Sequence, residues 1–168
     1  MMKFCPECGS NLTSHSIDDV NRLVCSNADC HFIYWNNPVP VVAALVNNND
    51  HYIIAHNKAW PEGIYSLITG YLEQNETPEQ AVIRETREEL GLDGEITRYI
   101  GHYSFFKKNQ LILCYELTAS GTVTLNHELS DWKSLTPEQL AEYDFRPLSI
   151  TQKIIQDWCK HNKIDPVT

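Results

Sequence analysis

The sequence has few basic side chains, with 13 Lys and Arg against 22 Asp and Glu and a formal charge of −9. Duplex nucleic acid is bound through clustered basic side chains, so this composition argues against simple electrostatic binding of a duplex. A phosphate-bearing small molecule is still compatible, provided that bound cations supply positive charge locally. We therefore expect a small-molecule partner and no duplex nucleic acid.

Long apolar runs are also missing. No stretch approaches the roughly 18 apolar residues that can span a bilayer, and the first residues, MMKFCPECGS, lack the basic-then-apolar layout of a secretory signal. No internal repeat or low-complexity tract indicates a solenoid. We expect a cytoplasmic protein without a membrane partner. Its 168 residues, 42 % apolar and 21 % charged, suit one compact domain with a small appendage.

Cysteines are concentrated at the start of the chain. Of the six, four lie within the first 30 residues as a C-x2-C and a C-x4-C pair: Cys5, Cys8, Cys25 and Cys30. Four thiolates in this pattern suit a structural Zn²⁺, which a segment of fewer than 40 residues needs in order to fold. Two alternatives stay open: His15 or His31 replaces one cysteine, or the quartet is unmetallated or disulfide-linked. Cys114 and Cys159 are expected to be packing residues.

Apolar runs and turn residues predict a mixture of strands and helices in the rest of the chain. Thr77 can cap a helix that starts at Pro78, with Gln80 closing a capping box and Gly91 ending it. We expect strands at residues 41–46, 51–55, 64–72, 95–106, 111–118 and 132–135, and helices over 78–90, after Pro137 and over 150–161. This pattern predicts an α/β or α+β layered fold. The Pro-containing NNPVP segment separates a zinc ribbon, residues 1–36, from the main domain, residues 37–168.

Three glutamates share one face of the helix expected over 78–90. Glu85, Glu88 and Glu89 are spaced i, i+3, i+4, so their like charges repel one another unless a cation gathers them. Carboxylates suit hard divalent cations such as Mg²⁺ or Mn²⁺. The alternative is a solvated acidic face on which Arg84 and Arg87 pair with their neighbours.

The surrounding string, GYLEQNETPEQAVIRETREELGL over residues 70–92, resembles the Nudix box. That pattern reads Gly, five residues, Glu, seven residues, Arg-Glu, an aliphatic residue, any residue, Glu-Glu, any residue, Gly, aliphatic. Every defined position matches in register except Thr86, which replaces an aliphatic residue and whose methyl group can pack in the same way. The resemblance implies an α/β Nudix fold, an α/β/α sandwich with a mixed sheet.

The resemblance also implies roles for single residues. Glu85, Glu88 and Glu89 would bind the catalytic Mg²⁺ or Mn²⁺ ions, and the carbonyl of Gly70 would be a further ligand. Arg84 would hold a box glutamate, expected to be Glu88, and Glu76 would orient a ligand or its loop. The general base varies within the family and can come from outside the box. Glu128 is our candidate for it; the alternative is an acid on a surface loop.

Residues 65–73, YSLITGYLE, are similar to the Phe-Ser-Val-Leu-Ala-Gly-Phe-Val-Glu segment of the NADH pyrophosphatase branch, which also carries a zinc ribbon. The Ser-Gln-Pro-Trp-Pro-Phe-Pro motif of that branch is missing, because residues 101–113 read GHYSFFKKNQLIL. Diphosphate cleavage in an NADH-like or ADP-ribose-like nucleotide is therefore expected, with specificity for NADH left open. Tyr65, Glu73 and Phe106 are the expected substrate contacts, and the related branch predicts a homodimer.

Two other functions remain open at this point. One is a phosphatase that removes modified nucleoside triphosphates, which would use the same helix. The other is a nucleotide-sensing or RNA- or protein-binding zinc-ribbon module on a retired Nudix fold. Retired enzymes commonly lose a metal ligand, whereas all three box glutamates are present here.

Overall fold

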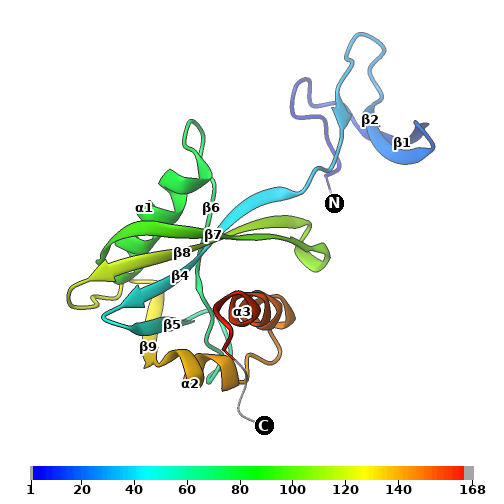
Figure 1. Cartoon of the computed structure of the whole chain (residues 1–168). Coiled ribbons are helices and arrows are strands. Elements are labelled where there is room, and N and C mark those ends of the chain that lie inside the picture. Colours follow the sequence, from blue (N-terminus) through cyan, green and yellow to red (C-terminus); the bar gives the residue numbers. More distant parts are fainter. Residues whose placement is uncertain (1, 165–168) are drawn as a thin grey trace. The chain divides into compact units, whose positions relative to one another are not determined.

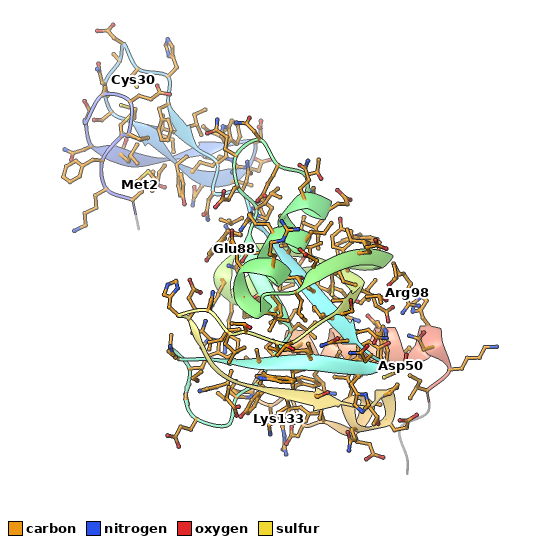
Figure 2. All side chains as sticks on the ribbon, turned by 90° about the vertical axis from the view of Figure 1, so that its left-hand side faces the viewer. Met2, Cys30, Asp50, Glu88, Arg98 and Lys133 are labelled. Carbon is orange, nitrogen blue, oxygen red and sulfur yellow. The ribbon has the colours of Figure 1, made fainter. Side chains whose placement is uncertain are left out.

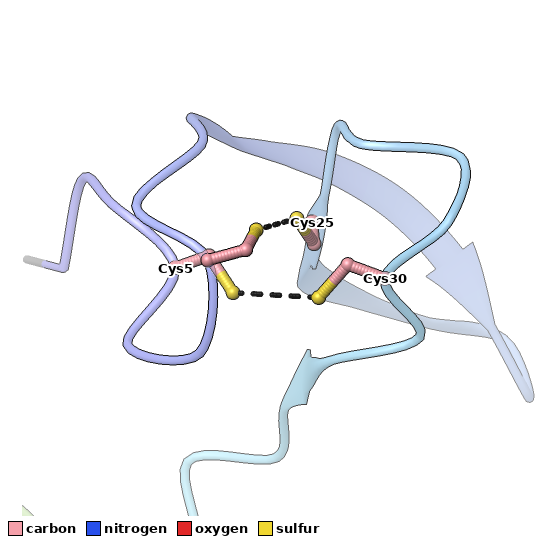
Figure 3. Close-up of side chains that lie close together, drawn as sticks. Cys5, Cys25 and Cys30 are labelled. Carbon is pink, nitrogen blue, oxygen red and sulfur yellow. Dashed lines mark hydrogen bonds between the residues drawn. The ribbon is translucent and has the colours of Figure 1, made fainter.

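The computed structural model describes residues 2–164, in two compact units that divide between Pro38 and Val39 (Figure 1). The first unit contains a three-stranded antiparallel sheet in the order β1 (Leu12–Ile17), β2 (Val20–Cys25), β3 (Ile33–Tyr34). Cys25 ends β2, and the other three N-terminal cysteines lie in two loops beside these strands (Figure 3). The small sheet thus provides a frame for the cysteine cluster.

The second unit is built on a mixed sheet around β4 (Val39–Asn48). Strands β7 (Asp93–Phe105), β8 (Gln110–Ser120), β4, β5 (His51–Asn57) and β9 (Leu129–Leu135) follow one another in that order, and β6 (Ile68–Tyr71) also pairs with β4. Only the β4–β8 pair is parallel. Strand β4 therefore lies at the centre and touches three neighbours.

Helices cover both faces of this sheet. Alternate residues of β4 point to opposite sides: Val42 packs in a cluster with Val82 and Leu90 of α1 (Pro78–Leu90), while Leu45 packs with residues of α3 (Ser149–Asn162). The short α2 (Pro137–Glu142) contributes Leu140 to the α3 side. Burial on both faces explains the continuous apolar run of β4. The predicted α/β/α sandwich with a mixed sheet is confirmed.

Local signals determine the ends of α1. The Thr77 hydroxyl accepts from the Gln80 N–H at 3.3 Å, and the Gln80 side chain accepts from the Thr77 N–H at 2.8 Å. Gly91 ends the helix with φ 68° and donates its N–H to the Arg87 carbonyl. These two ends confirm the capping box and the stop expected from the sequence. None of the helices within residues 2–164 is both long and apolar enough to cross a membrane.

The strand expected over residues 64–72 is shorter than predicted, because this segment changes partner. Ser66 exchanges backbone hydrogen bonds with Ala55 of β5, at 2.9 and 3.0 Å, and only from Ile68 does the chain pair with β4. Similarly, Phe106 belongs to a 3-10 turn, η1 (Phe106–Lys108), and not to β7. Both differences depend on the neighbouring strand, which local sequence does not specify.

Candidate active site and cysteine cluster

A cleft of about 580 Å³ opens in the second unit, bordered by α1, β4, β6, the β7–β8 hairpin tip and the start of α3. Five acidic side chains line it: Glu73, Glu85, Glu88, Glu89 and Glu128. The rest of the lining is largely apolar and aromatic, including Trp60, Phe105, Ile112 and Ile154. The cleft therefore combines an acidic side with an apolar side, as a site for a metal-bound phosphate attached to an organic group requires.

Gly70 lets the acidic helix approach the sheet. A Cβ added at Gly70 would lie 1.9 Å from both Cδ and Oε1 of Glu85. Gly70 pairs with Val42 in the β4–β6 ladder, so its backbone position is determined by the sheet. The close approach of the Glu85 carboxylate is the physical reason for glycine here.

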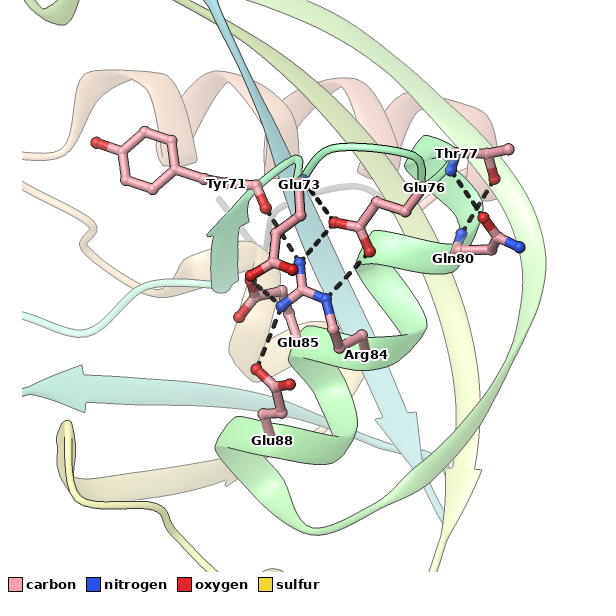
Figure 4. A network of polar contacts seen from close by, with 8 residues as sticks. All are labelled: Tyr71, Glu73, Glu76, Thr77, Gln80, Arg84, Glu85 and Glu88. Carbon is pink, nitrogen blue, oxygen red and sulfur yellow. Dashed lines mark hydrogen bonds and ion pairs between the residues drawn. The ribbon is translucent and has the colours of Figure 1, made fainter.

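Arg84 is the centre of the polar network beside the cleft (Figure 4). Its Nη2 donates to Glu76 Oε1 at 2.7 Å and its Nε to Glu76 Oε2 at 3.1 Å, while Nη1 donates to Glu85 Oε1 at 2.7 Å and to Glu88 Oε2 at 3.2 Å. Nη2 also donates to the Tyr71 carbonyl at 3.1 Å. The predicted Arg84–Glu88 contact is present, but Glu76 is the two-point partner. Arg84 thus ties the loop before α1 to the helix.

Glu89 is the most deeply placed acid of the cleft, 7 % exposed. No hydrogen-bond partner for its side chain is found among residues 2–164. Burial, followed by the negative charges of Glu85, Glu128 and Glu88, raises the pKa of Glu89 to about 8. Burial also raises the pKa of Glu85, against the opposing effect of Arg84. A divalent cation would offset both the cost of burying these negative charges and their mutual repulsion. The acidic side of the cleft therefore fits such an ion.

Glu128 enters the same cleft from the loop between β8 and β9. The Asn126 side chain accepts from the backbone N–H of Glu128 at 2.9 Å and of Leu129 at 3.2 Å, and the Asn126 N–H donates to the Glu89 carbonyl at 3.3 Å. The Lys58 N–H donates to the Glu128 carbonyl at 2.9 Å. These bonds hold the loop against the end of α1, and the charge of Glu128 acts on both Glu85 and Glu89.

Two of the three predicted substrate contacts lie elsewhere. Glu73 lines the cleft, but Tyr65 and Phe106 are not among the described residues that do. The Tyr65 hydroxyl donates to Asp131 of β9, and Lys133 Nζ lies 4.3 Å from the centroid of the Tyr65 ring. Figure 2 labels Lys133 on β9 and Glu88 on α1. Phe106 is 90 % exposed at the hairpin tip. The sequence context that predicts both contacts does not show in which direction an aromatic ring points.

Sequence reasoning missed other residues near the cleft. Lys108 and Gln110 line it from the hairpin tip, and the buried Ser66 and Thr151 hydroxyls, 2.9 Å apart, line it near α3. Asn126 was missed too, although Asn followed by a loop acid is typical of a turn in which the side chain accepts backbone N–H groups. For Lys108 no local signal exists, because its place depends on the pairing of β7 with β8.

The four N-terminal cysteines form a compact cluster (Figure 3). Their sulfur atoms all lie within 4.8 Å of one another, with Cys5–Cys30 at 3.7 Å and Cys8–Cys25 at 3.4 Å. Tetrahedral Zn–S bonds of about 2.3 Å imply sulfur separations near 3.8 Å, whereas a disulfide requires about 2.05 Å. All described cysteines are free, and neither His15 nor His31 belongs to the cluster. The arrangement fits a four-thiolate Zn²⁺ site.

The thiols of this cluster are supported by backbone groups. Asn27 N–H donates to Cys25 Sγ at 3.5 Å, and hydrogen bonds with the side chain and backbone of Ser10 lower the pKa of Cys8 to about 6. N–H groups directed at sulfur favour the thiolate form that binds metal. The Asn27 N–H lowers the pKa of Cys25 in this way, but burial and the neighbouring Cys8 thiol outweigh it and raise that pKa overall. Cys114 and Cys159, in contrast, are buried in the core of the second unit, as predicted for packing residues.

Within residues 2–164, the cysteines are the only group of three or more Cys, His, Asp or Glu side chains that is this compact. The helix acids share the cleft without meeting so closely, because Arg84 binds Glu85 and Glu88 from the side. The structure therefore places Glu85, Glu88 and Glu89 at one cleft together with Gly70 and Glu128.

Residues 37–154 match the family profile of the NUDIX domain. The chain belongs to the Nudix family. Residues 70–92 are therefore its Nudix box, and Thr86 fills the usual aliphatic position as a fully buried residue whose hydroxyl donates to the Val82 carbonyl at 2.8 Å. That bond satisfies the one polar atom by which threonine differs from an aliphatic side chain.

Among curated proteins, the Nudix chain is similar to the NAD-capped RNA hydrolase NudC of Vibrio atlanticus, with 31 % identity over 80 % of the chain and 50 % of that protein. It is also similar to the human mitochondrial NAD(P)H pyrophosphatase NUDT13, at 27 % identity over 77 % of the chain and 36 % of that protein. The chain thus spans about half the length, or less, of these relatives. A NUDIX hydrolase of Nitrosomonas europaea has the same fold, with a TM-score of 0.80 at 22 % identity over 96 % of this chain and 93 % of that one.

Proposed function

We propose that this Nudix protein is a Mg²⁺-dependent hydrolase that cleaves the diphosphate bond of a nucleoside diphosphate derivative, of the NAD(H) or ADP-ribose type. The observation that carries the proposal is the set of box acids, Glu85, Glu88 and Glu89, gathered with Gly70 and Glu128 on one side of a single cleft. Such a set is suited to hard cations, and the apolar residues that line the same cleft are suited to an organic group.

Each residue has a role in this proposal. Glu85, Glu88, Glu89 and the Gly70 carbonyl would hold Mg²⁺ or Mn²⁺, which would supply charge neutralisation of the diphosphate and activation of water. Arg84 is a positioning residue, since its nitrogen atoms are engaged by Glu76, Glu85 and Glu88. Glu128 is the proposed general base, because it faces the metal-binding acids from outside the box. Glu73 is the proposed substrate contact among the three expected from the sequence.

The activities for which the relatives are named support the substrate class. NudC is named an NAD-capped RNA hydrolase and NUDT13 an NAD(P)H pyrophosphatase, and NAD and NADPH are dinucleotides that contain a diphosphate. This chain covers only part of each of them, and residues 101–113 differ from the NADH pyrophosphatase pattern. We therefore propose the dinucleotide class and not NADH alone.

The proposal includes a structural zinc ribbon over residues 1–36 and a hydrolase domain over 37–168, of which residues 165–168 lie outside the described part. The sulfur separations of Cys5, Cys8, Cys25 and Cys30 support the Zn²⁺ assignment. A closed four-cysteine site has no open coordination position, so it contributes architecture and no catalysis. A homodimer and a cytoplasmic location remain predictions from the sequence.

The purified chain with Mg²⁺ should be assayed with NADH, ADP-ribose and an oxidised deoxynucleoside triphosphate, with AMP and pyrophosphate measured as products. We expect AMP from the first two. Pyrophosphate from the third alone would favour the nucleotide-sanitising function instead. Glu89→Gln should abolish turnover, whereas Glu79→Gln should retain it. Glu79 lies on the same helix, outside the cleft, where its carboxylate accepts from the Tyr115 hydroxyl at 2.9 Å.

A further inference from the structure

Acidic side chains outnumber basic side chains in the lining of the cleft. Two basic side chains are found among its described lining residues, Arg84 and Lys108, against five acids. Arg84 is not available to a ligand, because its three guanidinium nitrogen atoms donate to Glu76, Glu85, Glu88 and the Tyr71 carbonyl within 3.2 Å. Lys108 has no ion-pair or hydrogen-bond partner for its side chain among residues 2–164. It is the cation of the cleft that remains available to a ligand.

Lys108 and the acidic side approach the cleft from different parts of the sheet. Gly70 pairs with Val42 on one flank of β4, whereas Gln110, two residues after Lys108, pairs with Val39 on the other flank. Three residues along a strand correspond to roughly 10 Å, and the two flanking strands are also about 10 Å apart. The backbone of Lys108 therefore lies roughly 14 Å or more from that of Gly70, which exceeds the length of one diphosphate group.

The hairpin tip that carries Lys108 is a defined structure. The turn η1 is closed by Asn109, which has φ 51° and donates its N–H to the Phe106 carbonyl at 3.2 Å. The Val39 N–H donates to the Asn109 carbonyl at 2.9 Å, which ties the tip to the start of β4. Beside it, Gln110 Nε2 donates to the Tyr71 hydroxyl at 3.3 Å. These bonds keep the backbone of Lys108 beside the cleft.

From these observations we infer that Lys108 binds a second phosphate of the substrate, one carried on a nucleoside and separate from the diphosphate that is cleaved. This inference rests on the proposed function. Metal ions would neutralise the diphosphate at the acidic side, but an additional phosphate on the far side of the nucleoside needs a cation there, and Lys108 supplies it. In a protein with a formal charge of −9, an unpaired lysine at this position distinguishes substrates by their extra charge.

Two substrates carry such a phosphate: a dinucleotide with a 2′-phosphate, and a dinucleotide whose ribose is joined to an RNA chain. The first is tested by comparing kcat/KM for NADPH and NADH, the second by comparing a short NAD-capped RNA oligonucleotide with NAD. Lys108→Met, which keeps the alkyl chain and removes the charge, should lower kcat/KM for the phosphate-bearing member about tenfold more than for its partner, the size expected for one charge-assisted hydrogen bond in an accessible cleft. Lys108→Arg should retain most of the preference.

Lys107→Met is the matched control, because Lys107 is the exposed neighbour in the same turn and does not line the cleft. It should leave both preferences unchanged. If the Lys108-dependent preference appears only for NADPH over NADH, the bound phosphate is the 2′-phosphate. If it appears only for NAD-capped RNA over NAD, the bound phosphate belongs to the RNA chain. An equal loss for both members of each pair would show that Lys108 serves the cleaved diphosphate, and an unchanged Lys108→Met would show that it serves neither; either result overturns the inference.

Binding of products separates this inference from the proposed hydrolysis. Adenosine 2′,5′-bisphosphate and AMP differ by one phosphate and need no turnover, so their dissociation constants can be measured by calorimetry. We expect the bisphosphate to bind about tenfold more tightly to the wild type, and equally with AMP to Lys108→Met. If the protein hydrolyses no dinucleotide but still shows this binding difference, the proposed function is contradicted and the inference is not. Hydrolysis without any Lys108-dependent difference in binding or preference would contradict the inference alone.

Discussion

Arg84 and Glu76 form a two-point ion pair across the loop–helix junction of the Nudix box, with Nη2–Oε1 at 2.7 Å and Nε–Oε2 at 3.1 Å. Both side chains are largely buried, 24 % and 14 % exposed. Glu76 Oε1 also accepts from the Glu73 N–H at 2.7 Å, so the pair closes the loop that leads from β6 to α1 (Figure 4). The arginine of the box is thus a structural clamp for the segment that presents Glu73 and Gly70.

Arg84→Lys should lower the free energy of unfolding by about 1–2 kcal/mol, because a lysine cannot reproduce the two-point geometry. Urea denaturation of Arg84→Lys, Glu76→Gln and the double variant measures the coupling. We expect a coupling free energy of about 1 kcal/mol. Additive effects of the two substitutions would contradict the clamp.

Glu89→Gln should stabilise the protein in magnesium-free buffer at pH 8 while abolishing activity. The pKa of Glu89 in the folded chain, about 8, lies above its ordinary value of 4.5, so the folded state holds the proton more tightly than the unfolded state. Stability is therefore lost as the pH rises from about 4.5 to 8, with a slope of at most about 1.4 kcal/mol per pH unit. Thermal denaturation from pH 5 to 8 should show this slope in the wild type and a smaller slope in Glu89→Gln. The buffer should be depleted of Mg²⁺ without a strong chelator, which would also remove zinc. Equal slopes would show that Glu89 does not titrate in this range.

Asn126→Ala should reduce kcat roughly tenfold, the size typical of a residue that orients a functional side chain. The Asn126 side chain accepts from the Glu128 N–H while its own N–H donates to the Glu89 carbonyl, so it sets the distance between these acids. If Asn126 acts through Glu128, its substitution should have little further effect in a Glu128→Gln background. Asn126→Asp, which retains the accepting oxygen, should restore most of the activity. Independent, multiplicative losses would point to a general structural role.

Gly70→Ala should lower activity by roughly one to two orders of magnitude, since misplacing a functional group by about 1 Å has effects of that size. The new Cβ would meet the Glu85 carboxylate at 1.9 Å, which forces Glu85 out of its place beside β6. The Mg²⁺ dependence of turnover gives the readout, and we expect a higher Mg²⁺ requirement. An unchanged Mg²⁺ requirement would contradict the assignment of Glu85 or of Gly70 as a metal ligand.

One Zn²⁺ per chain is expected by elemental analysis. Cys25→Ser should lose it and unfold the first unit, because a unit of this size has too small a core to fold without the metal. Cys114→Ser is the control: this buried cysteine belongs to the core of the second unit, so the variant should keep its zinc and lose stability only there. Full zinc occupancy in Cys25→Ser would contradict the four-cysteine assignment.

Much of this protein was determined by the sequence alone, where the signal is local. Thr77, Pro78, Gln80 and Gly91 define α1, since capping involves backbone groups within one turn of the cap. The i, i+3, i+4 spacing of the box glutamates puts them on one face of whatever helix forms, and the C-x2-C spacing of Cys5 and Cys8 brings their thiols together in any compact knuckle. The same local patterns predicted an α/β or α+β layered fold, and the resemblance of residues 70–92 to the Nudix box implied the α/β/α sandwich.

Only the tertiary structure decided which distant residues share the cleft. Lys108 comes to it through the pairing of β7 with β8, and Glu128 through hydrogen bonds of its loop to Lys58 and to the end of α1. The change of partner from β5 to β4 at residues 66–68 shortened one predicted strand, and the bond to Asp131 kept Tyr65 out of the lining. Such contacts join segments far apart in the chain, and strand pairing and side-chain packing select them. The local propensity of a segment determines neither its strand partner nor its side-chain packing.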